Sequence, residues 1–494
     1  SHVHPPMGGV EMLRCDLSGG HSRQDYLETV GAYAASLPDV EWILGGGWSM
    51  PAFPGGVPTA ADLDAVVGAR PVFLPNRDHH SAWVSTRALE LAGITAATPD
   101  PVDGRIERDA AGQPTGALHE GAMSLVERLL PPLRTEDYVQ GLLAAQAYLH
   151  SLGITAWQDA WVTSSPGQNS FEAYMQLAGD ARLTARVVAA LWWERGRGAE
   201  QVDGFSALRA RAAEADRFAA TSVKIMQDGV CETFTAAMLT PYLDAHGHST
   251  DNCGLSFVDP ESLREHVTLL DAEGFQVHVH AIGDRAVREA LDAVESARAA
   301  NGPSGLRHHV AHLQVVHLDD VERFAGLGVV ANFQPLWACG DEQMMELTVP
   351  FLGPERSALQ YPIGSLQSRS VPIAFGSDWP VSTPNPFAEM HVAVTRVAPA
   401  GARFGADPGS VDEAPFLPDE RIDLASAVRA FTLGSAYVNH LEAETGSIEP
   451  GKRADLAVID RNLFEVDELD GGVAAAQVIV TMVEGEVVFE RAGS

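Results

Sequence analysis

Helix-like stretches alternate with short apolar runs through the middle of the chain, and this alternation most constrains the fold. Residues 135–153 have the pattern of a helix, and an apolar run over residues 154–160 follows them. The same unit recurs at residues 259–283, 284–314 and 318–335. Helices that alternate with strands are typical of parallel βα units, so the sequence predicts an α/β protein with a barrel or a doubly wound sheet.

Two other regions break this rhythm. Residues 20–130 are rich in Gly and Pro, so we expect an insertion between the first strand and the main series, with a strand of its own at residues 70–76. From about residue 441, short β-like runs follow one another without helices. We therefore predict one large domain, residues 1–440, and a small β module, residues 441–494.

Composition and charge exclude several classes of function. The chain has 33 Lys and Arg against 66 Asp and Glu, a net charge of -33, which repels nucleic acids and anionic membranes. No stretch approaches the roughly 18 consecutive apolar residues that a membrane span needs. The four cysteines are scattered and form no Cys-x-x-Cys pair, and no secretory signal heads the sequence. We expect a cytoplasmic protein that acts on a small-molecule substrate.

Several histidines and one aspartate occupy positions that suit metal ligands. His2 and His4 point the same way if SHVHP is a strand, and His280 lies near the end of the run QVHVHAIG. His312 and Asp378 also lie at the ends of apolar runs, where parallel barrels collect their chemistry. Imidazoles and a carboxylate suit zinc, and their number exceeds the three protein ligands of one open catalytic site. The sequence thus predicts one or two divalent ions.

Lys224 is the candidate for a group that bridges two ions. It falls in the apolar run of TSVKIMQDG, as a residue of a barrel strand would. A carboxylated lysine presents two anionic oxygens and could hold two metals about 3.5–4 Å apart. A snorkelling surface lysine and an amine that polarises the substrate directly are the alternatives. For His278, His308, His309 and His317 we keep the interpretation of hydrogen-bonded core residues.

The motifs SHVHP, DHHSAWVSTRALELAGI, HVHAIGDRAV, HVAHLQVVH and GSDWPV, in this order, resemble those of the metal-dependent amidohydrolase superfamily. The subgroup they resemble contains YtcJ-like proteins and N-substituted formamide deformylases. The resemblance implies a distorted (β/α)₈ TIM barrel with an insertion after strand 1 and a small β-sandwich. It implies His2 and His4 for one metal, Lys224 as bridge, and His280 and His312 for the second. It also implies Asp378 as ligand and proton shuttle, and further residues before Ser1.

The resemblance also suggests which residues meet the substrate. Asp78 and His80 in NRDHHSAWV and Glu120 in GALHEGAM have contexts like those of substrate-facing loops, although ordinary turns would explain them equally. Trp337 and Trp379 follow predicted strands and either line a pocket or pack in the core.

The predicted activity is hydrolysis of an amide or formamide-type C–N bond by metal-activated water. Deamination or lactone hydrolysis at the same site and a non-catalytic scaffold are the alternatives, because one fold hosts many chemistries. The sequence does not decide whether the protein forms a homodimer, although dimers are common among such barrels.

Overall fold

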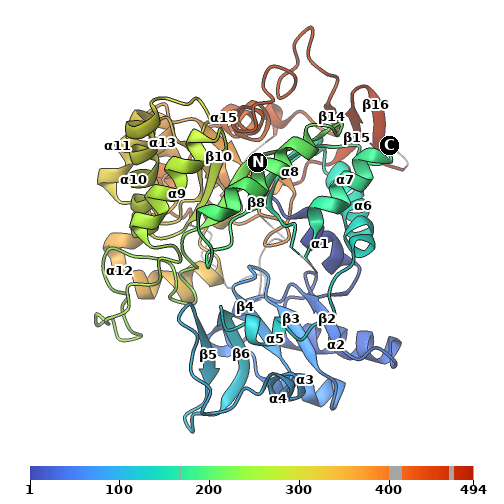
Figure 1. The fold of residues 1–494 in the computed structure, drawn as a ribbon, viewed down its shortest axis with the longest axis vertical. Coiled ribbons are helices and arrows are strands. Elements are labelled where there is room, and N and C mark those ends of the chain that lie inside the picture. Colours follow the sequence, from blue (N-terminus) through green and yellow to red (C-terminus); the bar gives the residue numbers. More distant parts are fainter. Residues whose placement is uncertain (166–167, 400–413, 467–471, 493–494) are drawn as a thin grey trace.

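A seven-stranded parallel sheet forms the centre of the larger part of the molecule (Figure 1). The computed structural model describes all residues except 166–167, 400–413, 467–471 and 493–494. Across the sheet the strands follow the order β13 (Ile373–Phe375), β12 (Val330–Phe333), β11 (His309–His312), β10 (Gln276–Ala281), β9 (Phe218–Met226), β8 (Arg186–Trp192) and β7 (Ala156–Val162). Neighbours in the sheet are mostly consecutive in the chain, as the βα rhythm predicts.

The first four residues connect the two edges of this sheet. On one side, Val3 N donates to Gln158 O (3.1 Å) in β7, and Ala160 N donates to Val3 O (2.9 Å). On the other side, beyond β13, Asp378 N donates to His2 O (2.8 Å) and His4 N donates to Trp379 O (2.8 Å). The N-terminal segment is therefore a neighbour of both edges, and its His2 and His4 side chains face the cavity at the strand ends.

Amphipathic helices connect the strands and cover the outside of the sheet (Figure 1). In α10 (Asp284–Asn301) the buried side chains recur every three or four residues, which places them on one face of the helix. The predicted helices are confirmed as α6 (Thr135–Ser151), α9 (Pro260–Ala272), α10 and α11 (Leu318–Leu327). The others in this part are α1 (Pro5–Met12), α7 (Ser170–Gly179), α8 (Val202–Ala212), α12 (Val349–Ser357), α13 (Ile363–Ser368), α14 (Pro386–Thr395), α15 (Leu424–Arg429) and α16 (Ser435–Val438).

A second, mixed sheet of six strands lies in the lower part of Figure 1. The strand predicted at residues 70–76 is present as β3, but the sequence analysis did not identify the other five. The sheet begins at Cys15, somewhat before the expected start of the insertion. Its strands, in order, are β1 (Cys15–Asp16), β2 (Ile43–Gly46), β3 (Val72–Pro75), β4 (Ser81–Val84), β6 (Pro114–Glu120) and β5 (Gly104–Arg108). The helices α2 (Arg23–Ser36), α3 (Ala60–Val67), α4 (Thr86–Ala92) and α5 (Ser124–Glu127) accompany it.

The end of the chain forms a three-stranded antiparallel sheet of β14 (Leu456–Ile459), β15 (Val478–Val483) and β16 (Glu486–Glu490). Within the described residues this region contains one sheet, whereas a sandwich has two facing sheets. Arg186 of β8 anchors it through Asp455 (3.0 Å) and Glu484 (2.8 Å). Thr481 Oγ1 also donates to His150 O (2.6 Å) at the end of α6.

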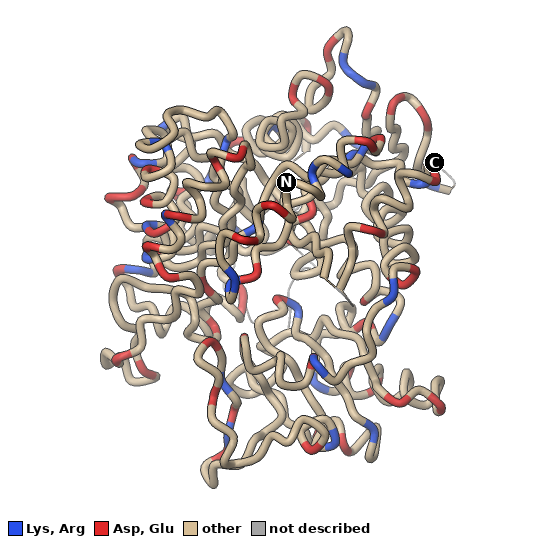
Figure 2. The backbone as a smooth tube through the Cα atoms, in the orientation of Figure 1, with Lys and Arg blue, Asp and Glu red and all other residues tan. Residues whose placement is uncertain are grey.

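The surface carries charge over both parts of the molecule. Acidic positions outnumber basic ones and are spread over the helices and loops (Figure 2). Among the described residues, no helix combines the length and the apolar character that crossing a bilayer requires.

The close contact between α1 and α6 yields a stability prediction. A Cβ atom at the buried Gly9 would lie 1.9 Å from the carbonyl oxygen of Gly141, so Gly9→Ala must push the helices apart. We expect its free energy of unfolding, measured by urea denaturation, to fall by about 1–3 kcal/mol. Gly204→Ala in α8 is the control, because a Cβ atom at that position would meet nothing within 4 Å. It should raise stability by about 0.5–1 kcal/mol. Equal effects of the two substitutions would contradict the packing argument.

Candidate metal centre

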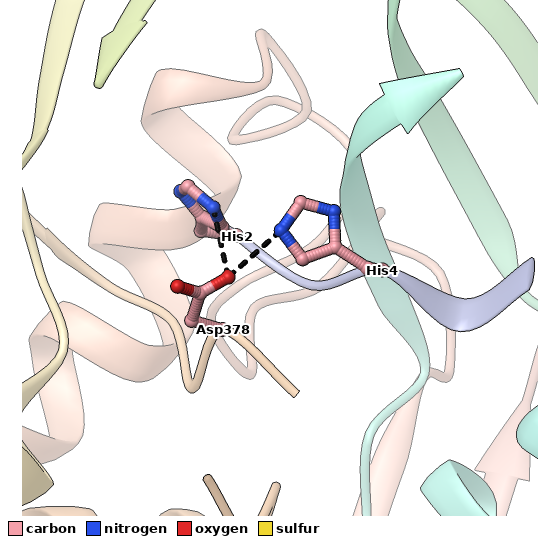
Figure 3. Close-up of side chains that lie close together, drawn as sticks. All are labelled: His2, His4 and Asp378. Atoms are coloured by element: carbon pink, nitrogen blue, oxygen red, sulfur yellow. Dashed lines mark ion pairs between the residues drawn. The ribbon is translucent and has the colours of Figure 1, made fainter. Parts of the chain in front are cut away.

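His2, His4 and Asp378 meet at the mouth of the parallel sheet. The Nε2 atoms of His2 and His4 lie 3.1 and 2.8 Å from Asp378 Oδ1, and Figure 3 shows both rings turned toward this carboxylate. One ligand atom from each of the three residues lies within 4.8 Å of the others. Burial alone would raise the pKa of Asp378, but His2 and His4 hold it well below its usual range. The carboxylate is therefore ionised and available to a cation.

His280, His312 and Lys224 border the same group. The His312 ring centroid lies 4.8 Å from that of His2 and 4.4 Å from that of His280. Lys224 Nζ lies 3.4 Å from His2 Nε2. All six candidate ligands thus face one interior, although His2, His4 and Asp378 form the tightest cluster.

The protonation states of these groups suit a bound cation. Burial pushes the pKa values of His2, His280 and His312 well below the usual range, so each imidazole is neutral and can offer a lone pair. Burial also lowers the pKa of Lys224 to about 7. A neutral amine is the form of lysine that reacts with carbon dioxide.

His312 gives the clearest indication that a ligand belongs here. The side chain is 2% exposed, yet neither of its ring nitrogens has a hydrogen-bond partner among the described residues. A buried polar atom without a partner costs about 1–3 kcal/mol. A divalent metal would bind one of the two ring nitrogens of His312. Neutral imidazoles and a carboxylate are donors that such ions accept. The residues present therefore fit a metal.

Asp228 supports His280 from behind, and the sequence analysis missed it. Its Oδ1 accepts from His280 Nδ1 (3.1 Å), which leaves Nε2 of the ring for a ligand. The same carboxylate accepts backbone N–H groups of Ile282, Gly283 and Ala237, which fix its position. Asp228 follows the apolar run of β9 as Asp378 follows that of β13, so the strand-end rule that selected Asp378 would have found it.

His278 supports His2 in a similar way. Its Nε2 shares a hydrogen bond of 2.9 Å with His2 Nδ1, and both side chains are fully buried. This agrees with the interpretation of His278 as a hydrogen-bonded core residue. The contact fixes the ring of His2 with its Nε2 toward Asp378.

The six-stranded sheet contributes a second set of side chains to the centre. His80 Nδ1 donates to Glu120 Oε1 (2.9 Å), and Asp78 Oδ1 accepts from the backbone N–H of His80 (2.9 Å). The His80 ring centroid lies 5.7 Å from that of His280. Glu120 thus acts on His80, and Thr235 Oγ1 donates to the same Glu120 oxygen (2.7 Å). Burial would lower the pKa of His80, but Glu120 raises it to about 9.

Four residues at this site have a strained backbone conformation. His79, Glu120, His312 and Asp378 have φ angles of 63°, 52°, 80° and 57°, a region that residues other than glycine rarely adopt. Such strain persists where the surroundings fix a functional geometry. Positive φ angles also occur elsewhere in the described residues, as at Ala181 and Ser370, and at this site they set the directions of the His312 and Asp378 side chains.

A cavity of about 60 Å³ opens between the candidate ligands and an aromatic wall. Trp161 and Trp192 stack on each other with centroids 4.4 Å apart, and Trp337 stacks on His312 at 5.4 Å. All three tryptophans line the cavity, together with His80 and Asp78. The sequence analysis did not identify Trp161 and Trp192.

Trp379 does not line this cavity, which agrees with the second of the two interpretations that the sequence left open, packing in the core. Its ring covers Gly8, where a Cβ atom would lie 2.7 Å from it, and packs against Tyr148 with centroids 5.6 Å apart. The side chain is 6% exposed and belongs to the core. The residue next to Asp378 thus anchors helix α1 rather than a substrate.

Comparison with known proteins agrees with this geometry. A model of the amidohydrolase family matches residues 1–489. The chain belongs to the amidohydrolase family. It is 29% identical to the putative amidohydrolase YtcJ of Bacillus subtilis, over 99% of this chain and 88% of that one. It is 28% identical to the N-substituted formamide deformylase of Arthrobacter pascens, over 100% of this chain and 87% of that one. These two relatives place it in the YtcJ-like subgroup of the amidohydrolases.

A solved structure has the same fold. The uncharacterised metal-dependent hydrolase of Pyrococcus horikoshii matches with a TM-score of 0.70 and 26% identity, over 95% of this amidohydrolase and 86% of that chain. The α/β architecture of the parallel sheet is therefore that of a known hydrolase.

The contact between Asp228 and His280 yields a prediction about metal binding. Asp228→Asn keeps the shape of the side chain but weakens its hold on the His280 ring, so we expect affinity for a divalent ion to fall about 10–100-fold. The affinity of the protein for the ion is measured by competition with a chelator of known affinity. The control is Asp284→Asn, a buried carboxylate that accepts from Leu239 N (2.8 Å) and not from a candidate ligand. Unchanged affinity in Asp228→Asn would remove its supporting role.

Proposed function

We propose that this amidohydrolase hydrolyses the C–N bond of an amide or formamide-type substrate at a centre of one or two divalent metal ions. The observation that carries the proposal is the convergence of His2, His4 and Asp378 beside the unpartnered, buried His312. The similarity to an N-substituted formamide deformylase supports the bond type, and the similarity to a metal-dependent hydrolase supports the metal.

The proposal includes the arrangement of the scaffold. The seven strands and the N-terminal segment together make a distorted (β/α)₈ TIM barrel, because residues 1–4 hydrogen-bond to both edges of the sheet. The six-stranded sheet is an insertion after the first strand, within a domain of residues 1–440. The C-terminal sheet, within residues 441–494, belongs to a β-sandwich.

We assign the ligands in two groups. His2 and His4 would hold one ion and His280 and His312 the second, Lys224 would be the bridging residue once carboxylated, and Asp378 would be a further ligand. Zinc suits this set of nitrogen and oxygen donors. When bound, the metal lowers the pKa of a water molecule and polarises the carbonyl group of the substrate.

Asp378 moves the proton. Its ionised carboxylate accepts a proton from the attacking water and returns it to the leaving nitrogen as the C–N bond breaks, which is general base and then general acid catalysis by one group. His80 contacts the substrate, with Glu120 and Asp78 fixing its ring and backbone. The tryptophan wall excludes water from the apolar part of the substrate.

A substrate screen tests the proposed bond type. Metal-loaded protein is offered N-formyl amines, N-acyl amino acids and cyclic amides, with lactones and amino-substituted heterocycles in parallel. We expect release of an amine from at least one amide class. Turnover of lactones or heterocycles alone would contradict C–N hydrolysis of amides.

Asp378→Asn tests the proton transfer. Asparagine keeps the size of the side chain but cannot accept the proton from water, so we expect kcat to fall about 10²–10⁴-fold. Metal content is measured on both proteins, because Asp378 is also a candidate ligand. Trp379→Phe, beside it in the chain but packed in the core, should keep kcat within about threefold. Wild-type turnover per bound metal in Asp378→Asn would exclude Asp378 as the proton shuttle.

Lys224 is tested through its dependence on carbon dioxide. Protein stripped of metal and reloaded in buffer free of carbon dioxide should recover little activity, and added bicarbonate should restore it, because the carbamate forms from the neutral amine. Lys224→Arg is the control, since a guanidinium forms no carbamate. Full recovery without bicarbonate would show that Lys224 acts unmodified.

A further inference from the structure

A second cavity, of about 100 Å³, adjoins the metal centre. The two cavities share part of their walls, so a molecule that occupies one can reach into the other. The shared residues are Asp78, Val230, Ile282, Trp337 and Val381. Groups that line the second cavity but not the first therefore meet the part of a substrate that lies away from the cleaved bond.

Two carboxylates from different loops face this second cavity. Glu232 follows β9 and Asp341 follows β12, on the side of the sheet that bears the metal centre. Thr348 Oγ1 donates to Glu232 Oε1 (2.9 Å), and Asp341 Oδ1 accepts from Met344 N (2.8 Å). These contacts hold each side chain in place and leave further acceptor capacity on each carboxylate.

The electrostatic environment of these carboxylates is unfavourable without a cation. Burial, together with the nearby Glu342 and Glu232, raises the pKa of Asp341 to about 6. Burial also raises the pKa of Glu232, with Asp78 adding to the shift. The neighbouring charges that act on both groups are thus negative.

Gln314 adds a neutral acceptor to the same wall. The residue is 3% exposed, and its Nε2 donates to Gln360 Oε1 (3.0 Å). Gln360 is itself fixed, because its own Nε2 donates to Ser357 O (3.4 Å). Because the Nε2 atom of Gln314 donates to Gln360, the side-chain carbonyl oxygen is the part of the Gln314 amide that can accept from an occupant of the cavity.

The other residues that line the second cavity do not change the sign of its charge. Arg77 also lines the cavity, but Asp78 beside it offsets its charge, and the Nη2 atom of Arg77 donates to Ser18 O (2.8 Å). Trp337 and Tyr361 contribute aromatic surface, which attracts cations through the ring quadrupole. The excess charge of the wall is therefore that of Glu232 and Asp341.

We propose that this cavity binds a positively charged group of the substrate, an ammonium or a guanidinium, while the C–N bond to be cleaved lies at the metal centre. Glu232, Asp341 and the Gln314 carbonyl oxygen accept its N–H donors, and Trp337 covers it. The inference rests on the proposed C–N hydrolase function and narrows the substrate class to amides that carry a basic group.

A matched substrate series tests the inference on the wild-type, metal-loaded protein. N-formyl-1,5-diaminopentane carries an ammonium where N-formylhexylamine has a methyl group and N-formyl-6-aminohexanoate has a carboxylate. Homologues with three to six methylenes cover different distances between the two sites. We expect kcat/KM for the best ammonium substrate to exceed that of its methyl analogue by about tenfold or more, the strength of a charged hydrogen bond. Equal or faster turnover of the methyl or carboxylate compounds would overturn the inference.

Variants in which an amide replaces a carboxylate show which residues cause the preference for the ammonium substrate. Asp341→Asn and Glu232→Gln should each lower kcat/KM for the ammonium substrate about tenfold and change that of the methyl analogue less than twofold. Glu346→Gln is the matched control, because Glu346 is exposed in the same segment as Asp341 and does not line the cavity. A loss of equal size for both substrates, or in the control, would overturn the assignment of these carboxylates.

The two proposals fail in different ways. If none of the formamides or other amides is cleaved, the proposed C–N hydrolase function is wrong. The cation site is then judged by binding alone, from calorimetric titration of the protein with 1,5-diaminopentane and hexanol. Binding of the diamine that is lost in Asp341→Asn supports the site, and equal binding of both compounds overturns it. If amides are cleaved without preference for the ammonium, only the cation site is wrong.

Discussion

The backbone hydrogen bonds of residues 1–4 to both edges of the parallel sheet are the contacts on which the candidate centre depends. They place His2 and His4 on either side of Val3, which pairs with β7, and they tie the carbonyl oxygen of His2 to the backbone of Asp378. Main-chain contacts thus fix the backbone of these three residues, and the side chains then contact one another and, for His2, the ring of His278. Helix α1 follows immediately, and Gly9 allows it to pack closely on α6. The backbone of His2 and His4 is therefore hydrogen-bonded on both sides, as that of a central strand is.

The six-stranded sheet contributes to the same centre because its loops reach over the mouth of the parallel sheet. Glu120 ends β6 with a positive φ, which turns its carboxylate toward His80 and Thr235. Thr235 belongs to the loop after β9, the strand that carries Lys224. One hydrogen-bonded chain therefore joins the two sheets directly beside the candidate ligands. This junction couples the position of His80 to the loop that also carries Asp228 and Glu232.

The elements predicted correctly from the sequence are those whose residues have a regular hydrophobic pattern. The helices of the βα units have clear 3.6-residue periodicity, and the positions of His280, His312 and Asp378 follow from the ends of their strands. The small strands of the insertion were missed because they are short and interrupted by Gly and Pro. The sequence left Trp379 undecided between a pocket and the core, because the space above Gly8, which accepts its ring, cannot be read from sequence. Glu232 and Asp341 lie about a hundred residues apart on loops, and only the folded chain brings them to one cavity.

Burial lowers the pKa values of the imidazoles at the candidate metal centre and raises those of the carboxylates in the second cavity. Both effects favour a bound cation, one in each cavity. Burial keeps the imidazoles neutral, so that they can bind a metal, and it makes the unpaired carboxylates of the second cavity costly until a positive charge neutralises them. Two cations in one cavity repel each other, so they must be separated. Trp337 provides the separation, since it stacks on His312 and also lines the second cavity. For the proposed substrate, the distance across this ring would set a minimum length between the bond to be cleaved and the basic group. The net charge of -33 would draw such a substrate toward the protein and repel an anionic one.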